Sequence, residues 1–440
     1  MKLSALLQGI KYDFFFGDWL VNVVGITDDS RKVKKDFLFI AVEGLTVDGH
    51  SFIPEAIKRG ACAIICERLP QKKHKKGKVV YIRVSDSRQA MGEVASNYFK
   101  KPSQKLKVIG ITGTKGKTTT AYFIYQMLSA LGKKVGIVST ISAKIGAKNY
   151  DTGFHVTNPD CITLHRLLNE MVKAGCQYAV LEVSSHGIDQ QRIAGVEFLV
   201  GVLTNIAPEH LDYHKTFREY KRVKMEFLKS CKIKIISPKI PKIAILPGIF
   251  NNLNADAAVD TIAALGLGRQ KALSFVKRLR LPPGRLEEVK NKLGIKIIID
   301  FAHTPDSFEN VLAYLRSITT GRLIAVFGSA GERDPYKRPK MGKITSQLAD
   351  IVILTAEDPR SERVSDINAQ IKSGIAKQNM NKVFEVSDRP GAIEYAIKSA
   401  VVGDTIAFLG KGHEKSMNLG GKGETVWSEL AQIKEALKKI

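Results

Sequence analysis

The sequence predicts an α/β protein with a parallel sheet in its central part and a second α/β unit after it. Three observations support this fold class. Strand-like apolar runs alternate with helical stretches from residue 107 to about residue 280, which is typical of parallel sheets crossed by helices. A strand, a glycine-rich loop and a helix follow one another over residues 108–120. Alternating elements then continue beyond residue 285.

Two polar, proline-containing segments, at 100–104 and at 281–285, indicate domain boundaries. At 440 residues the chain is also too long for a single core. We therefore predict three domains, at residues 1–103, 104–281 and 282–440.

The first domain contains short strands and turns, with the clearest strands at residues 37–42 and 60–66. Cys62 and Cys66 lie in the second of these runs, where packing in the core is the expected role of cysteine. The five cysteines of the chain include no Cys-x-x-Cys pair, which argues against a zinc site or a disulfide framework.

The most informative segment is residues 108–120, where a buried strand runs into a loop with three glycines and then into a helix. Loop amides and a helix N-terminus placed in this way bind phosphate. Lys117 is expected to reach the β- and γ-phosphates of ATP, and the Thr118 hydroxyl is expected to ligate Mg²⁺. The generic Walker spacing is missed by one residue, because five residues separate Gly110 from Gly116 and the generic pattern has four. The predicted ATP-binding residues of this loop are Gly113, Thr114, Lys115, Gly116, Lys117, Thr118 and Thr119.

Three further strands are expected in the central domain, at residues 135–138, 178–183 and 200–204. Polar clusters follow the last two strands, and the carboxyl ends of parallel strands are where an α/β protein binds its ligands. Glu182 and His210 offer an oxygen and an imidazole as ligands for a divalent cation near the γ-phosphate.

Four strands are expected in the last domain, which makes it a smaller α/β unit. They lie at residues 295–299, 323–327, 351–355 and 405–409.

The net charge of +25 is unusual and is compatible with nucleic acid, a membrane surface or polyanionic small substrates as partners. Its densest basic run, residues 72–78, lies between strand-like segments and reads as a solvated hairpin loop. No basic motif interleaved with aromatics appears, which disfavours a nucleic-acid-binding NTPase. No run approaches ~18 apolar residues, and the N-terminus lacks a secretory signal, so we expect a cytoplasmic protein that does not bind membranes.

Taken in order, the motifs of this chain resemble those of the Mur ligases nearly from end to end, and the phosphate loop also resembles that of folylpolyglutamate synthases. In the first domain the resembling segments are 29–31, 37–41 and 48–52. In the central domain they are the phosphate loop, 182–186 and 210–214. The later ones are 250–251, 283–287, 300–305, 331–334, 357–360 and 410–414.

The resemblance implies an N-terminal domain that binds a nucleotide sugar, a central ATPase domain and a Rossmann-like C-terminal domain. It implies an amide ligase that uses ATP and Mg²⁺ and acts on small molecules as a monomer. The carboxylate acceptor would be UDP-N-acetylmuramoyl-L-Ala-D-Glu, activated as an acyl phosphate during peptidoglycan precursor synthesis. The incoming amine would belong to meso-diaminopimelate or, alternatively, to L-lysine.

The resemblance also assigns roles to individual residues. Lys117, His210 and Lys224 would be catalytic, and Lys224, in the spacing Tyr-x-x-x-Lys from Tyr220, would be carbamylated. The metal ligands would be Thr118, Glu182, His210 and Lys224. The adenine nucleotide would contact Asn251 and Arg285, and Asp300 and His303 would lie near its ribose and base. The muramoyl-dipeptide would meet Ser30, Thr157, Ser184, Gln190 and Arg192, and the incoming amino acid Arg333, Asp358, Arg360, Gly410 and Glu414.

The chain departs from the family pattern at Lys115, where Asn is usual, and at Glu209, where Asp is common. Asp358 stands where enzymes specific for meso-diaminopimelate carry Asn. We nevertheless expect meso-diaminopimelate, because Arg360, with Arg333 nearby, suits a carboxylate. The alternatives are another Mur-type ligase or a folylpolyglutamate-type ligase, against which the Ser-Ser-His and Gly-Lys-Gly-His-Glu sequences count.

Overall fold

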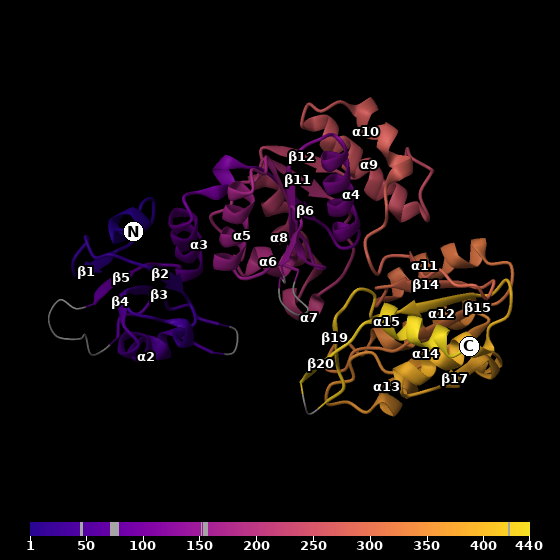
Figure 1. Cartoon of the computed structure of the whole chain (residues 1–440). Coiled ribbons are helices and arrows are strands. Elements are labelled where there is room, and N and C mark those ends of the chain that lie inside the picture. Colours follow the sequence, from indigo (N-terminus) through magenta and orange to yellow (C-terminus); the bar gives the residue numbers. More distant parts are fainter. Residues whose placement is uncertain (45–46, 71–78, 151, 153–156, 421–422) are drawn as a thin grey trace. The chain divides into compact units, whose positions relative to one another are not determined.

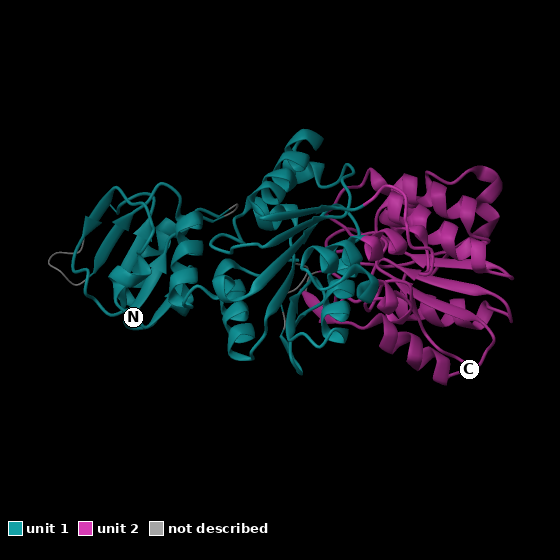
Figure 2. Ribbon diagram, turned by 90° about the horizontal axis from the view of Figure 1, so that it is seen from above, with its two compact units in different colours: residues 1–237, 257–272 teal, residues 238–256, 273–440 magenta. Residues whose placement is uncertain are grey.

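The computed structural model describes residues 1–44, 47–70, 79–150, 152, 157–420 and 423–440, so the basic run at 72–78 lies outside the described residues. The chain packs as two compact units (Figure 2). Unit 1 comprises Met1–Ser237 and Ala257–Ala272, and unit 2 comprises Pro238–Asp256 and Leu273–Ile440. Within the described parts of the chain, no helix is long and apolar enough to cross a membrane. The predicted boundaries at 103 and 281 remain predictions.

The first sheet of unit 1 has five strands in the order β1-β5-β4-β3-β2, and only the edge strand β1 is antiparallel. The predicted strands at 37–42 and 60–66 are confirmed as β3 and β4, and every residue of β4 is buried, as expected for a parallel strand covered on both faces. The strands are β1 (Phe14–Phe16), β2 (Gly25–Thr27), β3 (Phe37–Ile40), β4 (Ala61–Cys66) and β5 (Val80–Arg83). The helices are α1 (Leu3–Leu6), η1 (Ser30–Lys32), η2 (Gly49–Phe52), α2 (Ile53–Lys58), α3 (Ser87–Tyr98) and η3 (Pro102–Lys105).

The second sheet of unit 1 has the order β12-β11-β6-β10-β7-β8-β9, in which the first five strands are parallel. The three strands predicted after the phosphate loop are confirmed as β7, β10 and β11. The strands are β6 (Lys107–Thr112), β7 (Val135–Val138), β8 (Ala143–Ile145), β9 (Lys148–Tyr150), β10 (Tyr178–Glu182), β11 (Val200–Leu203) and β12 (Ile233–Ile236). The helices are α4 (Lys117–Ala130), α5 (Cys161–Lys173), α6 (Ser185–Asp189), α7 (Leu211–His214) and α8 (Phe217–Ser230).

Two neighbouring strands of this sheet, β6 and β10, send the chain in opposite directions. The chain leaves β6 towards β7 and leaves β10 towards β11, so the crevice at their carboxyl ends is a topological switch point, where open α/β sheets bind ligands. Helix α4 covers one face of the sheet, and α5 and α8 cover the other (Figure 1). Gly110 in β6 allows the close packing of α8, because a Cβ there would lie 2.5 Å from the Phe227 ring.

Unit 2 contains a six-stranded sheet in the order β13-β14-β18-β15-β16-β17, parallel except for β13, and a separate hairpin of β19 and β20. All four strands predicted for the last domain are confirmed, as β14, β15, β16 and β18. The strands are β13 (Glu287–Glu288), β14 (Lys296–Asp300), β15 (Leu323–Phe327), β16 (Ile351–Leu354), β17 (Val383–Glu385), β18 (Thr405–Leu409), β19 (Ser416–Asn418) and β20 (Glu424–Val426).

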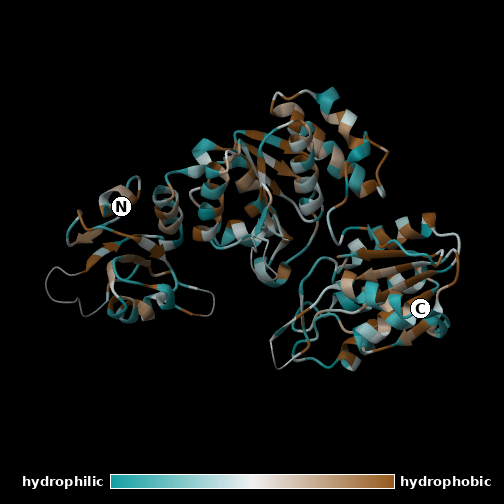
Figure 3. Ribbon diagram, viewed as in Figure 1, coloured by the Kyte–Doolittle hydropathy of each residue, from teal (hydrophilic) through white to brown (hydrophobic). Residues whose placement is uncertain are grey.

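Helices cover both faces of the unit 2 sheet, with α11 and α12 in one apolar core and α14 and α15 in the other. The strands are predominantly hydrophobic, whereas the helices carry residues of both kinds (Figure 3). The helices are α11 (Pro305–Ile318), α12 (Lys337–Leu348), α13 (Val364–Lys372), η5 (Lys377–Lys382), α14 (Arg389–Ser399) and α15 (Glu429–Lys438). Before this sheet come α9 (Ile249–Ala264), which has residues in both units, α10 (Arg269–Phe275) and η4 (Val276–Arg278).

A fully buried ion pair joins the second core of unit 2. Arg389 and Glu429 are both 0 % exposed, and the shortest distance between their charged atoms is 2.6 Å. Arg389 also donates hydrogen bonds to the carbonyls of Ala356 and Leu409, at 3.0 Å each. The buried guanidinium is therefore paired and hydrogen-bonded, as a charge in a protein interior must be.

Candidate active site

The predicted phosphate loop connects the end of β6 with the start of α4. Gly113 has φ +148° and Gly116 has φ +81°, conformations that favour glycine. A Cβ at Gly113 would lie 1.9 Å from the Thr204 hydroxyl oxygen, so the loop packs tightly on the end of β11. The loop thus leads directly into the N-terminus of α4, in the arrangement that binds phosphate.

Lys117, the first residue of α4, folds back over this loop. Its Nζ donates to the carbonyl oxygens of Gly113 and Thr114, at 3.1 and 3.0 Å. The Thr114 hydroxyl is fixed in turn by the Tyr220 hydroxyl at 2.9 Å and by the amide of Ala207. A cation is therefore held against the loop where a triphosphate would bind.

The switch point between β6 and β10 is bridged by two of the predicted metal ligands. The Thr118 hydroxyl donates to Glu182 Oε1 at 2.8 Å, and both side chains are buried. The other carboxylate oxygen accepts from the amide and the hydroxyl of Thr140, at 2.7 and 3.0 Å. This hydroxyl and carboxylate fit Mg²⁺, which binds few protein oxygens and completes its shell with water and substrate phosphates.

Asn158 connects Glu182 to the residues expected to bind the muramoyl-dipeptide, although we did not predict it from the sequence. Its side chain donates to the Glu182 carbonyl at 2.6 Å and accepts from the amide and the hydroxyl of Ser184, both at 2.9 Å. Its own carbonyl accepts from Arg192 at 2.9 Å. Its position between Thr157 and Pro159 was the only signal in the sequence.

The other predicted acceptor-binding residues also lie in unit 1. Arg192 Nε donates to Gln190 Oε1 at 3.0 Å. The Thr157 hydroxyl accepts from Thr140 at 3.2 Å. The Ser30 hydroxyl, in the first sheet's part of the unit, donates to Glu55 at 3.3 Å.

Lys224 lies on α8 and is 1 % exposed. Its Nζ donates to the Gly113 carbonyl at 2.8 Å and lies 4.7 Å from the centre of the Tyr220 ring. Burial, reinforced by the charge of Lys117, lowers the pKa of Lys224 to about 6. The side chain is therefore largely a neutral amine at pH 7.

His210 immediately precedes α7 and has φ +56°, and its ring lies edge-on to the His186 ring, with centroids 4.7 Å apart. Burial, opposed by the charge of Glu209, lowers the pKa of His210 to about 4, which leaves the imidazole neutral and able to ligate a metal. Glu209 forms an ion pair with Lys115, so two of the three residues that depart from the family pattern contact each other. The described residues contain no group of three or more His, Cys, Asp or Glu suited to a metal, and the role of His210 remains a prediction.

The nucleotide residues predicted after position 250 lie in unit 2. Asp300 accepts from the amides of Leu286 and Ala302, at 2.8 and 2.7 Å. Arg285 stacks over the Phe301 ring at 4.7 Å, and Phe301 O lies 2.8 Å from His303 Nδ1. Asn251 Nδ2 donates to the Pro247 carbonyl at 2.7 Å.

The predicted amino-acid site contains a buried lysine that the sequence analysis missed. Lys411 is 0 % exposed, bonds both oxygens of Asp358 and lies 2.7 Å from Glu414 Oε2. Burial raises the pKa of the neighbouring Glu357 to about 7, against the charges of Lys337 and Lys411. Glu357 and Lys411 are adjacent in sequence to Asp358 and Gly410, which was the signal for both.

The two arginines predicted for this site differ in their surroundings. Arg360 has φ +54° and donates to the Gly331 carbonyl at 3.0 Å, whereas Arg333 is exposed. Their common role towards a carboxylate remains a prediction.

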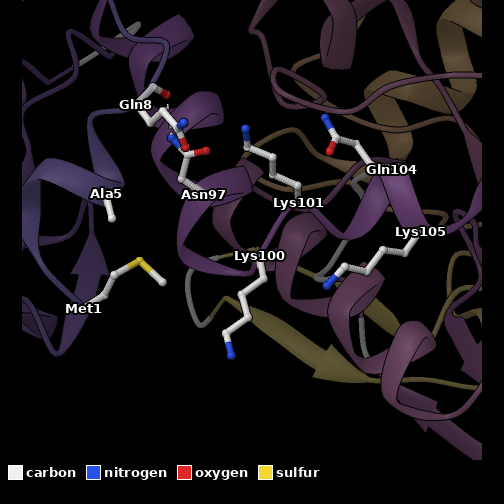
Figure 4. Close-up of a pocket in the computed structure, with 8 residues that line it drawn as sticks. All are labelled: Met1, Ala5, Gln8, Asn97, Lys100, Lys101, Gln104 and Lys105. Carbon is white, nitrogen blue, oxygen red and sulfur yellow. Dashed lines mark hydrogen bonds between the residues drawn. The ribbon is translucent and has the colours of Figure 1, made fainter.

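A hollow of about 590 Å³ in unit 1 involves none of the predicted site residues (Figure 4). Lys100, Lys101 and Lys105 line it together with Asn97, whose side chain donates to the carbonyls of Leu6 and Gln8. The hollow is therefore a basic surface feature that is separate from the phosphate loop.

Three family descriptions match most of the chain. Residues 22–99 match the Mur ligase family, catalytic domain; residues 111–261 match the Mur ligase middle domain; and residues 284–412 match the Mur ligase, glutamate ligase domain.

Individual proteins resemble the chain over its whole length. The UDP-N-acetylmuramoyl-L-alanyl-D-glutamate–2,6-diaminopimelate ligase 1 of Clostridium acetobutylicum is 37% identical, and the match covers 100% of both chains. A solved structure of a ligase with the same substrates in its name is 26% identical, with a TM-score of 0.65 over 100% of this chain and 99% of that one. MurF ligase from Thermotoga maritima, in complex with ADP, shares the fold at 20% identity and a TM-score of 0.61, over 96% of this chain and 99% of that one. The chain therefore belongs to the Mur ligase family.

Proposed function

We propose that this protein joins a diamino acid to UDP-N-acetylmuramoyl-L-Ala-D-Glu, with conversion of ATP to ADP and phosphate. The observation that carries the proposal is the buried bond between Thr118 and Glu182 at the switch point, one residue from Lys117. The similarity to named diaminopimelate ligases along the full chain supports the choice of substrates.

In the first step, a carboxylate oxygen of the acceptor attacks the γ-phosphorus, the bond to the bridging oxygen breaks, and ADP leaves. Both reactants are anions, so catalysis consists mainly of holding them together with cations. Lys117, fixed over the loop, supplies one positive charge. Thr118 and Glu182 would hold Mg²⁺, which when bound neutralises further charge on the phosphates.

In the second step, the amine of the amino acid attacks the acyl phosphate carbon, phosphate leaves, and the amine proton is released. The amine must be neutral to act as a nucleophile. The pKa values of His210 and His186 are both lowered to about 4, so their imidazoles are neutral at pH 7 and add no standing positive charge to this part of unit 1.

Lys224 is proposed to carry a carbamate. A buried amine with a pKa of about 6 is largely unprotonated at pH 7, and only the unprotonated amine reacts with carbon dioxide. The carbamate would place an anion beside the phosphate loop, where it can help to hold Mg²⁺. Activity of Lys224→Ala should then be partly restored by a short-chain carboxylic acid, while a free amine in bicarbonate-rich buffer together with an active variant would refute the modification.

The amino acid is proposed to be meso-diaminopimelate. Lys411 already contacts Asp358 and Glu414. The negative charge of these carboxylates is therefore largely balanced, and they would attract the side-chain ammonium of an L-lysine substrate only weakly. The distal carboxylate of meso-diaminopimelate would instead engage the guanidinium of Arg360.

The proposal is tested by measuring phosphate release from ATP with UDP-muramoyl-dipeptide, with and without meso-diaminopimelate, and by weighing the product. We expect release that depends on both substrates and a product heavier by one amino-acid residue. Phosphate release that depends on a folate and glutamate would assign the protein to the folylpolyglutamate-type ligases. Phosphate release that needs neither acceptor nor amino acid would refute the proposal.

A further inference from the structure

All of the described hydrogen bonds of Arg88 and Arg192, two arginines of unit 1, go to neutral acceptors. Arg88 donates to the carbonyls of Glu43 and Gln190, at 2.7 and 3.5 Å. Arg192 donates to the Gln190 side chain and to the Asn158 carbonyl. By contrast, the arginines Arg31, Arg83, Arg338 and Arg389 each bond a carboxylate.

The two guanidinium groups also repel each other. Burial lowers the pKa of Arg192, and the charge of Arg88 lowers it further, against the carboxylate of Asp160. Two half-buried cations that share the residue Gln190 weaken the fold unless an anion joins them. Guanidinium groups bind carboxylates and phosphates in the planar, two-pronged manner that such a pair can provide.

Tight packing fixes the position of this pair. Arg88 lies in the first turn of α3, and the same helix packs against residues 190–195. A Cβ at Gly92 would lie 2.4 Å from the Ala194 Cβ, and Gln191 Nε2 donates to Asp86 at 2.7 Å. Because these contacts leave no room for α3 to slide, Arg88 is held beside Arg192 before any ligand arrives.

We propose that Arg88 and Arg192 form a preformed binding site for an acidic group of the nucleotide-sugar acceptor, with Arg88 as a binding residue additional to those named above. This rests on the proposed function. The acid group is a carboxylate of the dipeptide or the pyrophosphate. Asn158 favours the carboxylate, because it links Arg192 directly to the Glu182 main chain and hence to the end of the substrate that reacts.

The test compares Arg88→Ala and Arg88→Lys with the wild-type protein by calorimetric titration with UDP-muramoyl-dipeptide and with UDP. Arg83→Ala is the matched control, because Arg83 belongs to the same unit and is paired with Asp13. We expect Arg88→Ala to weaken binding of UDP-muramoyl-dipeptide at least tenfold, Arg88→Lys to weaken it less, and Arg83→Ala to leave it unchanged. Weaker binding of UDP as well would identify the pyrophosphate as the group bound, and an effect on the dipeptide ligand alone would identify the carboxylate.

A second measurement separates binding from a structural role. If Arg88 only held α3 in place, its removal would lower the melting temperature; relief of repulsion predicts an unchanged or higher one. Suppose the wild-type protein binds and ligates UDP-muramoyl-dipeptide, and Arg88→Ala binds it within twofold as tightly. That result would overturn the arginine site and leave the proposed function standing. A wild-type protein that binds no UDP-muramoyl-dipeptide would overturn the proposed function together with it.

Discussion

Lys411 bonds both carboxylate oxygens of Asp358, at 2.9 and 3.1 Å, with the two side chains 0 % and 7 % exposed. The pair connects the loop after β16 with the loop after β18, and the amide of Asn418 adds a third bond to Asp358 at 3.0 Å. Asp358 therefore balances a buried cation.

Asp358→Asn should destabilise the protein, because among the described residues Lys411 would keep one ion pair, with Glu414. We expect a loss of about 1–3 kcal/mol in the free energy of unfolding. Asp366→Asn is the control, since its pair with Arg363 is exposed and should contribute little to stability. Denaturant titration measures both, and equal effects would show that the buried pair adds nothing.

The amino-acid preference follows from the same contacts. With Asp358 and Glu414 engaged by Lys411, we expect kcat/KM to be higher for meso-diaminopimelate than for L-lysine. Arg360→Lys should reduce this ratio about tenfold or more, since a lysine cannot bond a carboxylate in the two-pronged manner. Parallel assays with the two amino acids decide the point, and a ratio that favours lysine would reverse the assignment.

Lys117→Ala should abolish turnover of ATP while leaving the fold intact. The variant loses the cation that bonds the loop carbonyls of Gly113 and Thr114, and a single such charge at a phosphoryl transition state contributes ~100-fold or more in rate. Lys148→Ala, at an exposed position in β9, is the control. Activity retained within a few-fold, with an unchanged circular dichroism spectrum, would remove Lys117 from the mechanism.

Glu182→Gln should raise the Mg²⁺ concentration needed for nucleotide binding by about tenfold or more. The amide oxygen of Gln can still accept from Thr140, and its NH₂ group can donate to the Thr118 hydroxyl, so one bond reverses direction while the negative charge is lost. Titration of a non-hydrolysable ATP analogue at several Mg²⁺ concentrations measures this shift separately from activity. Glu170→Gln, whose partner Lys173 is exposed, should leave the dependence unchanged.

Lys224 predicts a particular pH dependence of stability in buffer free of carbon dioxide. Its folded-state pKa of about 6 lies below the ordinary value of about 10.4, so between these values the unfolded chain binds one proton more than the folded one. Stability from this group must therefore rise with pH across that window, by up to ~1.4 kcal/mol per pH unit. Near pH 6, Lys224→Met should be more stable than the wild type, and its stability should lack this rise with pH. Lys221 is exposed on the same helix, so Lys221→Met should show the pH dependence of the wild type.

Much of the fold could be predicted because parallel, buried strands are continuous apolar runs. The seven strands predicted after residue 107, other than the phosphate-loop strand, all appear at the expected positions. The antiparallel strands β1, β8, β9 and β13 could not be predicted, since two or three residues carry no usable periodicity.

The site divides in a similar way. The phosphate loop is a local pattern and was predictable, whereas Asn158 and Thr140 act through bonds to residues 24 and 42 positions away, which only the folded chain reveals. Lys411 was missed for another reason. A lysine beside glycine reads as a surface residue, and only burial between Asp358 and Glu414 shows otherwise.

The carbonyl oxygen of Gly113 accepts from both Lys117 and Lys224, at 3.1 and 2.8 Å. A positive charge on one of these lysines therefore disfavours a charge on the other, and the charge of Lys117 is part of what keeps Lys224 deprotonated. A triphosphate bound to Lys117 would cancel that repulsion, raise the affinity of Lys224 for a proton and so slow its reaction with carbon dioxide. The proposed carbamate of Lys224 would therefore form before the nucleotide binds, and a preparation given nucleotide before carbon dioxide should show a lag before it reaches its full rate.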